Sequence, residues 1–201
     1  MCFKKCNIQN TLNSYGAVAK LLHWVMAILM ISVLIIGLLL EDYEKTPEFF
    51  QLIGWHKEFG IMVLFLACVR LGWKVLDISP SLPSSMSTCA KIMAKLGHLG
   101  LYFLMFGLPI TGWIISSAAG YPVSMFGFFD LPMLTGKDKD FAHDVKEIHE
   151  LFANGLMALL AVHVLAALVH HFYYKDNILT RMLPNCRKKY DIKNPDISTG
   201  C

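Results

Sequence analysis

The sequence predicts an all-α membrane protein built as a bundle of four transmembrane helices. Apolar residues make up 55% of the 201 residues and the mean hydropathy is +0.50, values that are unusual for a protein folded in water. Four segments also reach the length of about 17–25 apolar residues that a helix needs to cross a bilayer. These segments are residues 17–40, 52–75, 96–117 and 148–173.

The four segments differ in what surrounds them. The first follows lysines, as a signal peptide would, but its apolar run is too long and no small-residue cleavage site follows, so we expect it to stay attached. The Ser/Pro-rich stretch SPSLPSSMST separates the second segment from the third as a loop. Pro109 should kink the third segment, which a bundle tolerates. We therefore expect a tail at 1–16, a membrane domain at 17–175 and a basic tail at 176–201.

The longest connection, residues 118–146, mixes Gly, Pro and aromatic residues (GYPVSMFGFFDLPM) with the charged stretch GKDKDFAHDVKE. Loops of this length are uncommon unless they are functional. We expect its aromatic half either to lie on the membrane interface as an aromatic belt or to cover something held between the helix ends.

Charged residues are distributed unevenly along the chain. Thirteen of the 18 basic residues lie in the two tails and in the connection between the second and third segments, when the adjoining helix ends are counted with them. The other two connections hold the remaining five, together with eleven of the 15 acidic residues. Because basic residues gather on the cytoplasmic side of membranes, both termini are expected in the cytoplasm, where the basic tail can contact anionic lipid. The sequence shows no surface of interleaved basic and aromatic residues, so it gives no indication of nucleic-acid binding.

Four of the eight histidines occur at matching depths in the predicted helices. His56 and His149 lie toward the outer face, and His23 and His163 lie toward the cytoplasmic face. His149 and His163 bound the stretch HELFANGLMALLAVH, in which fourteen residues at about 100° each bring both rings to one helix face, about 21 Å apart along the axis. The sequence therefore predicts an outer pair, His56 with His149, and an inner pair, His23 with His163.

Two stacked bis-histidine sites inside an apolar bundle are what two b-type haems require. The imidazoles bind the iron axially, while the macrocycle fills the space between helices. Small residues near the sites would let a planar group approach the backbone. They are Ala153, Gly155, Ala158, Ala161, Ala166 and Ala167. Because the six cysteines include no C-x-x-C-H motif, the haems would be bound non-covalently.

Two blander explanations of the four histidines stay open. Each ring alone could simply bond a neighbouring Ser, Thr or carbonyl group inside the membrane. Zinc or copper could also bind to the pairs, although such sites usually recruit a third or fourth ligand. Matching depth in two pairs favours the haem interpretation, because ionisable residues inside membranes are rare and usually functional.

The remaining histidines are weaker candidates for a site. His98 begins the third segment and would be a spare ligand without an unpaired partner, and His143 is expected to be solvated in the outer loop. His170 and His171 lie at the cytoplasmic end of the fourth segment, where the helix dipole favours histidine. Either of the last two could donate a hydrogen bond or a proton to a ligand near the inner haem.

Four stretches carry a resemblance to a known family: KLLHWVMAILM, GWHKEFGIMVLFLACVRLGWK, KLGHLGLYFLMFGLPITGW and, most specifically, KEIHELFANGLMALLAVHVLAALVHHFYYKDNILTRMLP. Over residues 15–184 the chain resembles the bacterial di-haem cytochrome b561 family. The resemblance implies that His23 and His163 ligate the inner haem and that His56 and His149 ligate the outer one. It also implies a bacterial inner membrane location and ubiquinone as a partner.

The resemblance implies two different activities. The best-understood family member is similar to a superoxide oxidase, which passes electrons from periplasmic superoxide through the haems to ubiquinone. Other relatives are electron-carrying membrane subunits of hydrogenases or dehydrogenases, and a shared fold does not choose between these roles. We expect a superoxide:ubiquinone oxidoreductase, with the haem-containing anchor as the alternative. A haem-free helical membrane protein, such as a transporter subunit, is a third possibility.

Candidate residues for the superoxide reaction lie in the long outer connection. Lys137, Lys139 and Lys146 would attract the anion, since focused charge raises the rate at which anions associate. Acidic residues alternate with these lysines, so a solvent-exposed loop with no role in anion attraction would show the same pattern.

Candidate residues for the quinone site lie toward the cytoplasmic face. They are Arg70, His98 and His170, which would supply a positive charge and protonatable groups. For Arg70, an equal alternative is a snorkelling residue that marks the membrane boundary.

Overall fold

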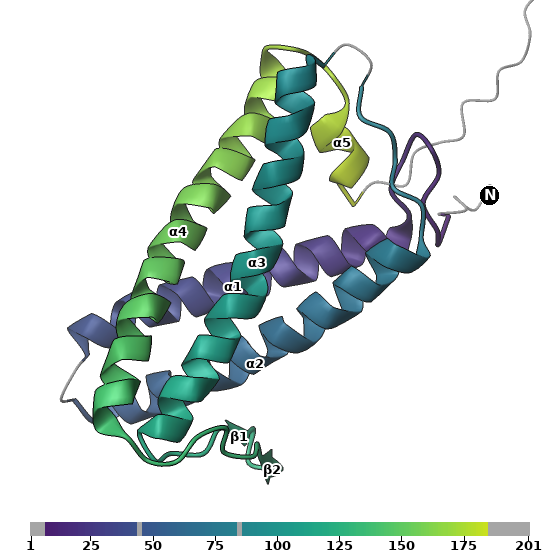
Figure 1. Cartoon of the computed structure of the whole chain (residues 1–201). Helices are drawn as coiled ribbons and strands as arrows, with labels where there is room; N and C mark the ends of the chain where they lie inside the picture. The colour runs from purple at the N-terminus through teal and green to yellow at the C-terminus, as the bar shows by residue number, and fades with distance from the viewer. Residues whose placement is uncertain (1–6, 44–45, 84–85, 185–201) are drawn as a thin grey trace, which may run out of the picture.

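The computed structural model of the chain describes residues 7–43, 46–83 and 86–184 (Figure 1). The outermost parts of both predicted tails therefore lie outside the described residues. Among the residues left out are several that entered the charge and cysteine patterns above, namely Cys2, Lys4, Lys5, Cys6, Lys45, Cys186, Arg187, Lys188, Lys189, Lys193 and Cys201.

Four long helices form the bulk of the structure, and each is long and apolar enough to cross a membrane. They are α1 (Ala17–Asp42), α2 (Pro47–Leu76), α3 (Thr88–Ala118) and α4 (Lys139–Phe172). The shortest has 26 residues, or about 39 Å at 1.5 Å per residue, which exceeds the hydrocarbon thickness of a bilayer. The predicted four-helix transmembrane fold is confirmed.

Helix α1 begins at the predicted residue, whereas α2, α3 and α4 begin earlier than the apolar windows predict, and side-chain caps start α3 and α4. The Ser87 hydroxyl accepts a hydrogen bond from the Ala90 amide at the start of α3, and Asp138 accepts one from the Phe141 amide at the start of α4. As a result, α4 includes eight residues that we predicted as loop, residues 139–146. His143, expected in the outer loop, lies in the first turns of α4 instead, where it is exposed.

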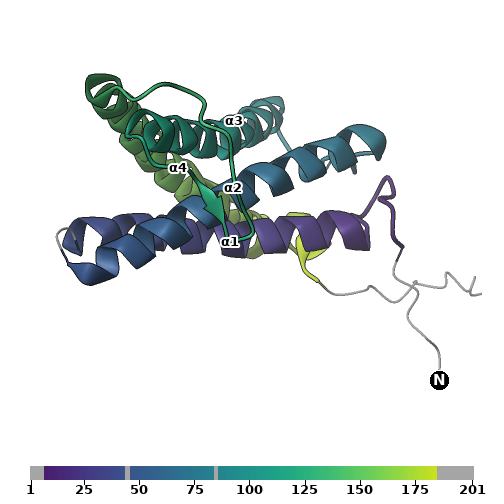
Figure 2. The same cartoon turned by 90° about the horizontal axis from the view of Figure 1, so that it is seen from below.

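The helices associate as two pairs, α1 with α2 and α3 with α4, and α2 joins the pairs by packing on α3. Figures 1 and 2 show the two pairs crossing at a wide angle. Helix α4 makes little close backbone contact with α1 or α2 in the described part of the chain. The two helices that carry the predicted partners of its histidines are therefore not packed tightly against it.

The buried core is small and lies at the middle of the bundle. Its members are Met26, Met30, Val63, Ala67, Leu104, Met105 and Leu156. Large apolar side chains such as Leu21, Ile28, Phe65 and Phe103 are instead exposed on the outside of the helices. This inverted pattern suits a bundle surrounded by lipid, because lipid tails cover apolar side chains at no cost.

The end of the bundle that carries the α1–α2 connection is here called the outer end. At this end a two-stranded antiparallel hairpin, β1 (Ser124–Met125) and β2 (Phe129–Asp130), follows α3. Its turn has positive φ at Phe126 and Gly127, as a tight hairpin turn with right-handed twist requires. The amide of Phe126 donates to Glu58 Oε1 over 3.2 Å, which holds the hairpin against the N-terminal half of α2.

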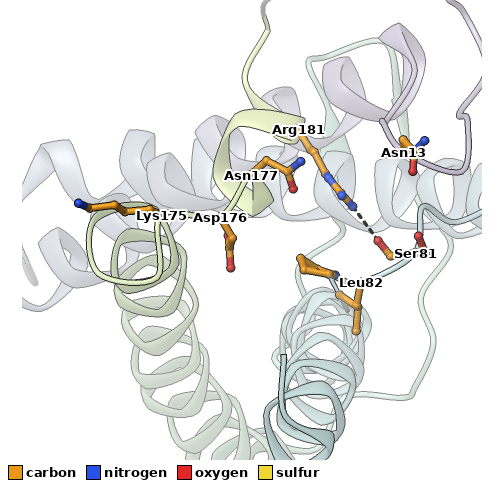
Figure 3. A pocket seen from close by; sticks show the side chains of 8 residues that line it. Asn13, Ser81, Leu82, Lys175, Asp176, Asn177 and Arg181 are labelled. Atoms are coloured by element: carbon orange, nitrogen blue, oxygen red, sulfur yellow. Dashed lines mark hydrogen bonds between the residues drawn. The ribbon is translucent and has the colours of Figure 1, made fainter. Parts of the chain in front are cut away.

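The opposite, inner end joins four separate segments of the chain. Trp24 Nε1 in α1 donates to the carbonyl of Met182 in the short helix α5 (Ile178–Met182) over 2.8 Å. Arg181 donates to the carbonyl of Ser81, and the Asn10 amide donates to Asp77. Between these segments lies an open polar cavity of about 510 Å³, lined by Lys175, Asp176, Arg181 and their neighbours (Figure 3).

Candidate functional site

The structure brings the four histidines together in the predicted pairs. At the outer end, His56 of α2 and His149 of α4 have ring centres 6.2 Å apart. At the inner end, His23 of α1 and His163 of α4 also have ring centres 6.2 Å apart. All four rings are half-buried between the helices, and α4 supplies one ring to each pair.

The common separation would fit two imidazoles that hold one metal ion between them. Two imidazoles that bind one metal ion from opposite sides, each through a bond of about 2 Å, have ring centres about 6.3 Å apart. A third ring at the inner end, His98, lies only 5.5 Å from His163, which is too close for the same opposed arrangement. Among the described residues, no group of three or more His, Cys, Asp or Glu side chains forms a metal cluster. The geometry therefore suits haem iron better than zinc or copper.

The surroundings of the outer pair also fit a metal ligand. Thr111 Oγ1 in α3 lies 2.8 Å from His149 Nδ1 and 2.8 Å from the carbonyl oxygen of Gly107. His56 Nδ1 is buried, and no hydrogen-bond partner is present for it in the described structure. Backbone also approaches both rings closely, since a Cβ added at Gly37 would lie 3.0 Å from His56 Cε1 and one added at Gly112 would lie 3.4 Å from His149 Cε1.

A lysine that the sequence analysis did not single out lies beside the outer pair. Lys57 follows His56 in α2 and is half-buried, and its Nζ donates to Ser116 Oγ over 3.3 Å and to the Pro122 carbonyl over 3.5 Å. No carboxylate of a described residue pairs with it. Only its position next to a candidate ligand could have indicated it, because the hydroxyl and carbonyl that hold it come from a distant part of the chain.

The three lysines predicted to attract an anion are less favourably placed. Lys146 forms an ion pair with Glu150, with Nζ 3.5 Å from Oε1. The stem of Lys137 lies against Gly120, and Lys139 is exposed in the first turn of α4. Their charges are thus partly balanced or lie in open solvent, whereas Lys57 is half-buried and forms no ion pair in the described structure, although the neighbouring Glu58 offsets part of its charge.

The inner pair is surrounded by polar groups of a different kind. The Arg70 guanidinium lies with Nη2 3.1 Å from His23 Nδ1, and its Nε donates to the Tyr102 hydroxyl over 3.3 Å. No carboxylate of the described chain forms an ion pair with Arg70. Nearby, burial raises the pKa of the Tyr15 phenol above its usual range, and the charge of Arg70 opposes this shift.

The three residues predicted for the quinone site do not form one cluster. Arg70 and His98 both flank the inner pair, and His98 is exposed on the surface of the bundle. His170 is engaged elsewhere, with its Nδ1 2.5 Å from Asp176 Oδ2. His171 contacts the ring of Phe172, with ring centres 4.9 Å apart.

Comparison with known proteins identifies the family. The profile described as prokaryotic cytochrome b561 matches residues 14–185. Cytochrome b561 homolog 2 of Escherichia coli (strain K12) is 34% identical, covering 91% of this chain and 98% of its own length. The probable superoxide oxidase CybB of Yersinia pestis is 31% identical, covering 83% of this chain and 93% of its own. Cytochrome b561 homolog 1 of Escherichia coli (strain K12) is 29% identical, covering 86% and 98%.

The profile match extends over all four membrane helices and both histidine pairs. Membership implies binding of b-type haem and electron transfer within a membrane, which agrees with the geometry of the pairs. The chain belongs to the prokaryotic cytochrome b561 family.

Proposed function

We propose that this protein is a di-haem cytochrome that oxidises superoxide at its outer end and reduces ubiquinone near its inner end. The observation that carries the proposal is the presence of two histidine pairs with the same 6.2 Å ring separation at opposite ends of one bundle. His56 and His149 would hold the outer haem, and His23 and His163 the inner one. Each haem, when bound, supplies an iron that accepts and releases a single electron.

The position of the pairs supports transfer across the membrane. His149 and His163 lie fourteen residues apart on the continuous helix α4, or about 21 Å along its axis. That distance is most of the thickness of the apolar layer. The pairs thus lie near opposite faces, and we place both chain termini on the cytoplasmic side of a bacterial inner membrane from the distribution of basic residues.

Superoxide as the donor is supported by the name of the Yersinia pestis relative and by individual lysines at the outer end. A small anion is drawn toward a positive charge whose field is not cancelled by a neighbouring carboxylate. Lys57 is the strongest candidate, because it follows His56 and forms no ion pair in the described structure, although Glu58 offsets part of its charge, and Lys137, Lys139 and Lys146 would add a weaker attraction.

Ubiquinone as the acceptor is supported by the polar groups of the inner end. Reduction of one quinone takes two electrons, from two superoxide ions that leave as oxygen, and two protons. Arg70 can donate hydrogen bonds to a quinone oxygen, and His98, exposed on the bundle surface, can deliver protons to a ligand that arrives through the lipid. His170 would act from further away, through its pair with Asp176.

Ligation at the inner pair would also release Arg70. A guanidinium only donates hydrogen bonds, so His23 Nδ1 accepts from it and the hydrogen of the neutral ring lies on Nε2. A neutral ring that binds a metal through Nε2 carries its hydrogen on Nδ1 instead, and it can no longer accept from Arg70. The guanidinium would then be free to bind another acceptor.

A second function, a haem-containing anchor for a hydrogenase or dehydrogenase, is favoured by one observation. The tip of the outer hairpin exposes aromatic side chains, with Phe128 86% and Phe129 61% accessible. Exposed apolar patches of this kind mark contacts with membrane or with a partner protein. A soluble redox protein docked there would deliver electrons next to the outer pair.

One experiment tests the proposed function and separates it from the second. The protein is purified in mild detergent, its haem per chain is measured, and the oxidised form is exposed to a superoxide source with and without ubiquinone. We expect two b-type haems that superoxide reduces and ubiquinone reoxidises. Two haems that ignore superoxide would refute the oxidase and leave the anchor, and absence of haem would refute both.

A further inference from the structure

The hydroxyl of Thr111 has more partners than it has hydrogens. Its Oγ1 lies 2.8 Å from the carbonyl oxygen of Gly107, 2.9 Å from that of Leu108 and 2.8 Å from His149 Nδ1. Threonine in a helix commonly gives its one hydrogen to a carbonyl three or four residues earlier. Both carbonyls are at this spacing, so the hydroxyl hydrogen is directed to the α3 backbone.

This arrangement decides which nitrogen of His149 carries a hydrogen. With its hydrogen given to a carbonyl, Thr111 Oγ1 can only accept from the ring, so His149 Nδ1 is the donor. In the neutral imidazole the other nitrogen, Nε2, then has a free lone pair, which is the form that binds a metal. The inner ring His23 shows the opposite arrangement, because its Nδ1 accepts from Arg70.

Helix α3 also fixes the position of the His149 ring. Gly112, the next residue after Thr111, lies so close to the ring that a Cβ there would be 3.4 Å from Cε1, an ordinary van der Waals contact. The ring is therefore hydrogen-bonded by one residue of α3 and packed against the next. Neither residue belongs to the helices that carry the outer pair.

We infer that Thr111 is a positioning residue for the outer site, which orients His149, holds its metal-binding tautomer and lowers the reduction potential of the outer haem. The inference rests on the proposed haem ligation. A ring N–H that donates to an acceptor makes the ligating nitrogen a stronger base, and a more basic ligand stabilises the oxidised iron. A haem, when bound there, would supply one-electron chemistry, and Thr111 itself would transfer no atom but only keep its hydrogen bond with His149 Nδ1.

The test is a redox titration of the outer haem alone. His163→Ala should remove the inner haem, so that one spectral wave remains, and Thr111→Val, Thr111→Ser and Ser32→Ala are compared in that background. Valine keeps the shape of threonine without the acceptor, and serine keeps the acceptor. Ser32 is the matched control, because its hydroxyl donates to the Ile28 carbonyl within a membrane helix and makes no hydrogen bond with a histidine in the described structure.

We expect Thr111→Val to raise the midpoint reduction potential of the outer haem by about 59 mV. For a one-electron step this corresponds to a tenfold change in the ratio of reduced to oxidised haem. Thr111→Ser and Ser32→Ala should leave the wave in place. An unmoved wave in a valine variant that retains its haem would overturn the role of Thr111 alone. If Thr111→Val loses the outer haem, the result for Thr111→Ser distinguishes the two explanations. Haem retained in Thr111→Ser would support the role of the hydroxyl, whereas haem lost there too would assign the effect to the methyl group and overturn the inference. A parent protein without any haem would instead refute the proposed function.

Discussion

The outer and inner histidine pairs have the same ring separation but opposite surroundings. The outer rings are held by a neutral hydroxyl and by close backbone at Gly37 and Gly112. The inner pair adjoins a guanidinium, a phenol and a third histidine. On the proposed function, the shared separation would reflect what ligation of one ion requires, and the difference would reflect what each end exchanges. On that proposal the outer site needs rigid ligands and a cation such as Lys57 to attract superoxide, whereas the inner site also needs groups that deliver protons to a quinone.

The most severe way to break this comparison is to remove one ligand from each pair. His149→Ala should cost the outer haem and His163→Ala the inner one, because each removes half of an axial pair. Each variant should retain one haem per chain by absorbance, with intact helix content by circular dichroism. His143→Ala, an exposed histidine in the same helix, is the control and should retain both. Loss of both haems from each single variant would contradict two independent sites.

A smaller effect is expected from removing the charge of the inner end. Arg70→Ala should slow ubiquinol formation roughly tenfold or more with both haems present, since a hydrogen bond from a charged donor contributes about 1.5–3 kcal/mol. Lys74→Ala removes an exposed cation at the same end, which lies 4.7 Å above the Tyr102 ring, and should have little effect. Unchanged quinol formation in Arg70→Ala with intact haem spectra would exclude Arg70 from the quinone site.

The smallest effect concerns anion attraction at the outer end. Lys57→Gln should slow reduction by superoxide about fivefold at low salt, which corresponds to the loss of about 1 kcal/mol of electrostatic attraction. The difference should shrink as ionic strength rises, because salt screens exposed charges. Lys146→Gln, whose charge is already paired with Glu150, should differ little from the parent in the same stopped-flow assay. Equal rates for the parent and Lys57→Gln at every salt concentration would show that another group attracts the anion.

The fold and the histidine pairs could be predicted because their signals are local. Hydropathy over about twenty residues identifies a membrane helix, and helical periodicity places His149 and His163 on one face. The true start of α4 was missed because Asp138 caps it well before the apolar stretch begins. The cap has a local sequence signal, an acidic residue before a helical segment, but hydropathy alone does not use it.

The residues that surround each pair could not be predicted, since they come from other parts of the chain. Thr111 lies 38 residues from His149 in sequence, and Arg70 lies 47 residues from His23. In the sequence Thr111 is one polar residue in an apolar helix, with no sign of which helix it faces. Such contacts depend on how helices are rotated against each other, which a single sequence does not specify.

Because α4 supplies a ring to both pairs, the helical segment between His149 and His163 fixes both the axial distance and the rotation angle between the two rings. Inserting one residue there would turn one ring by about 100° relative to the other and lengthen the helix by about 1.5 Å, so that only one pair could stay aligned. Four inserted residues would nearly restore the phase but add about 6 Å. The connections between helices can change in length during evolution. The thirteen residues between His149 and His163 cannot gain or lose one without moving one of these histidines out of line with its partner.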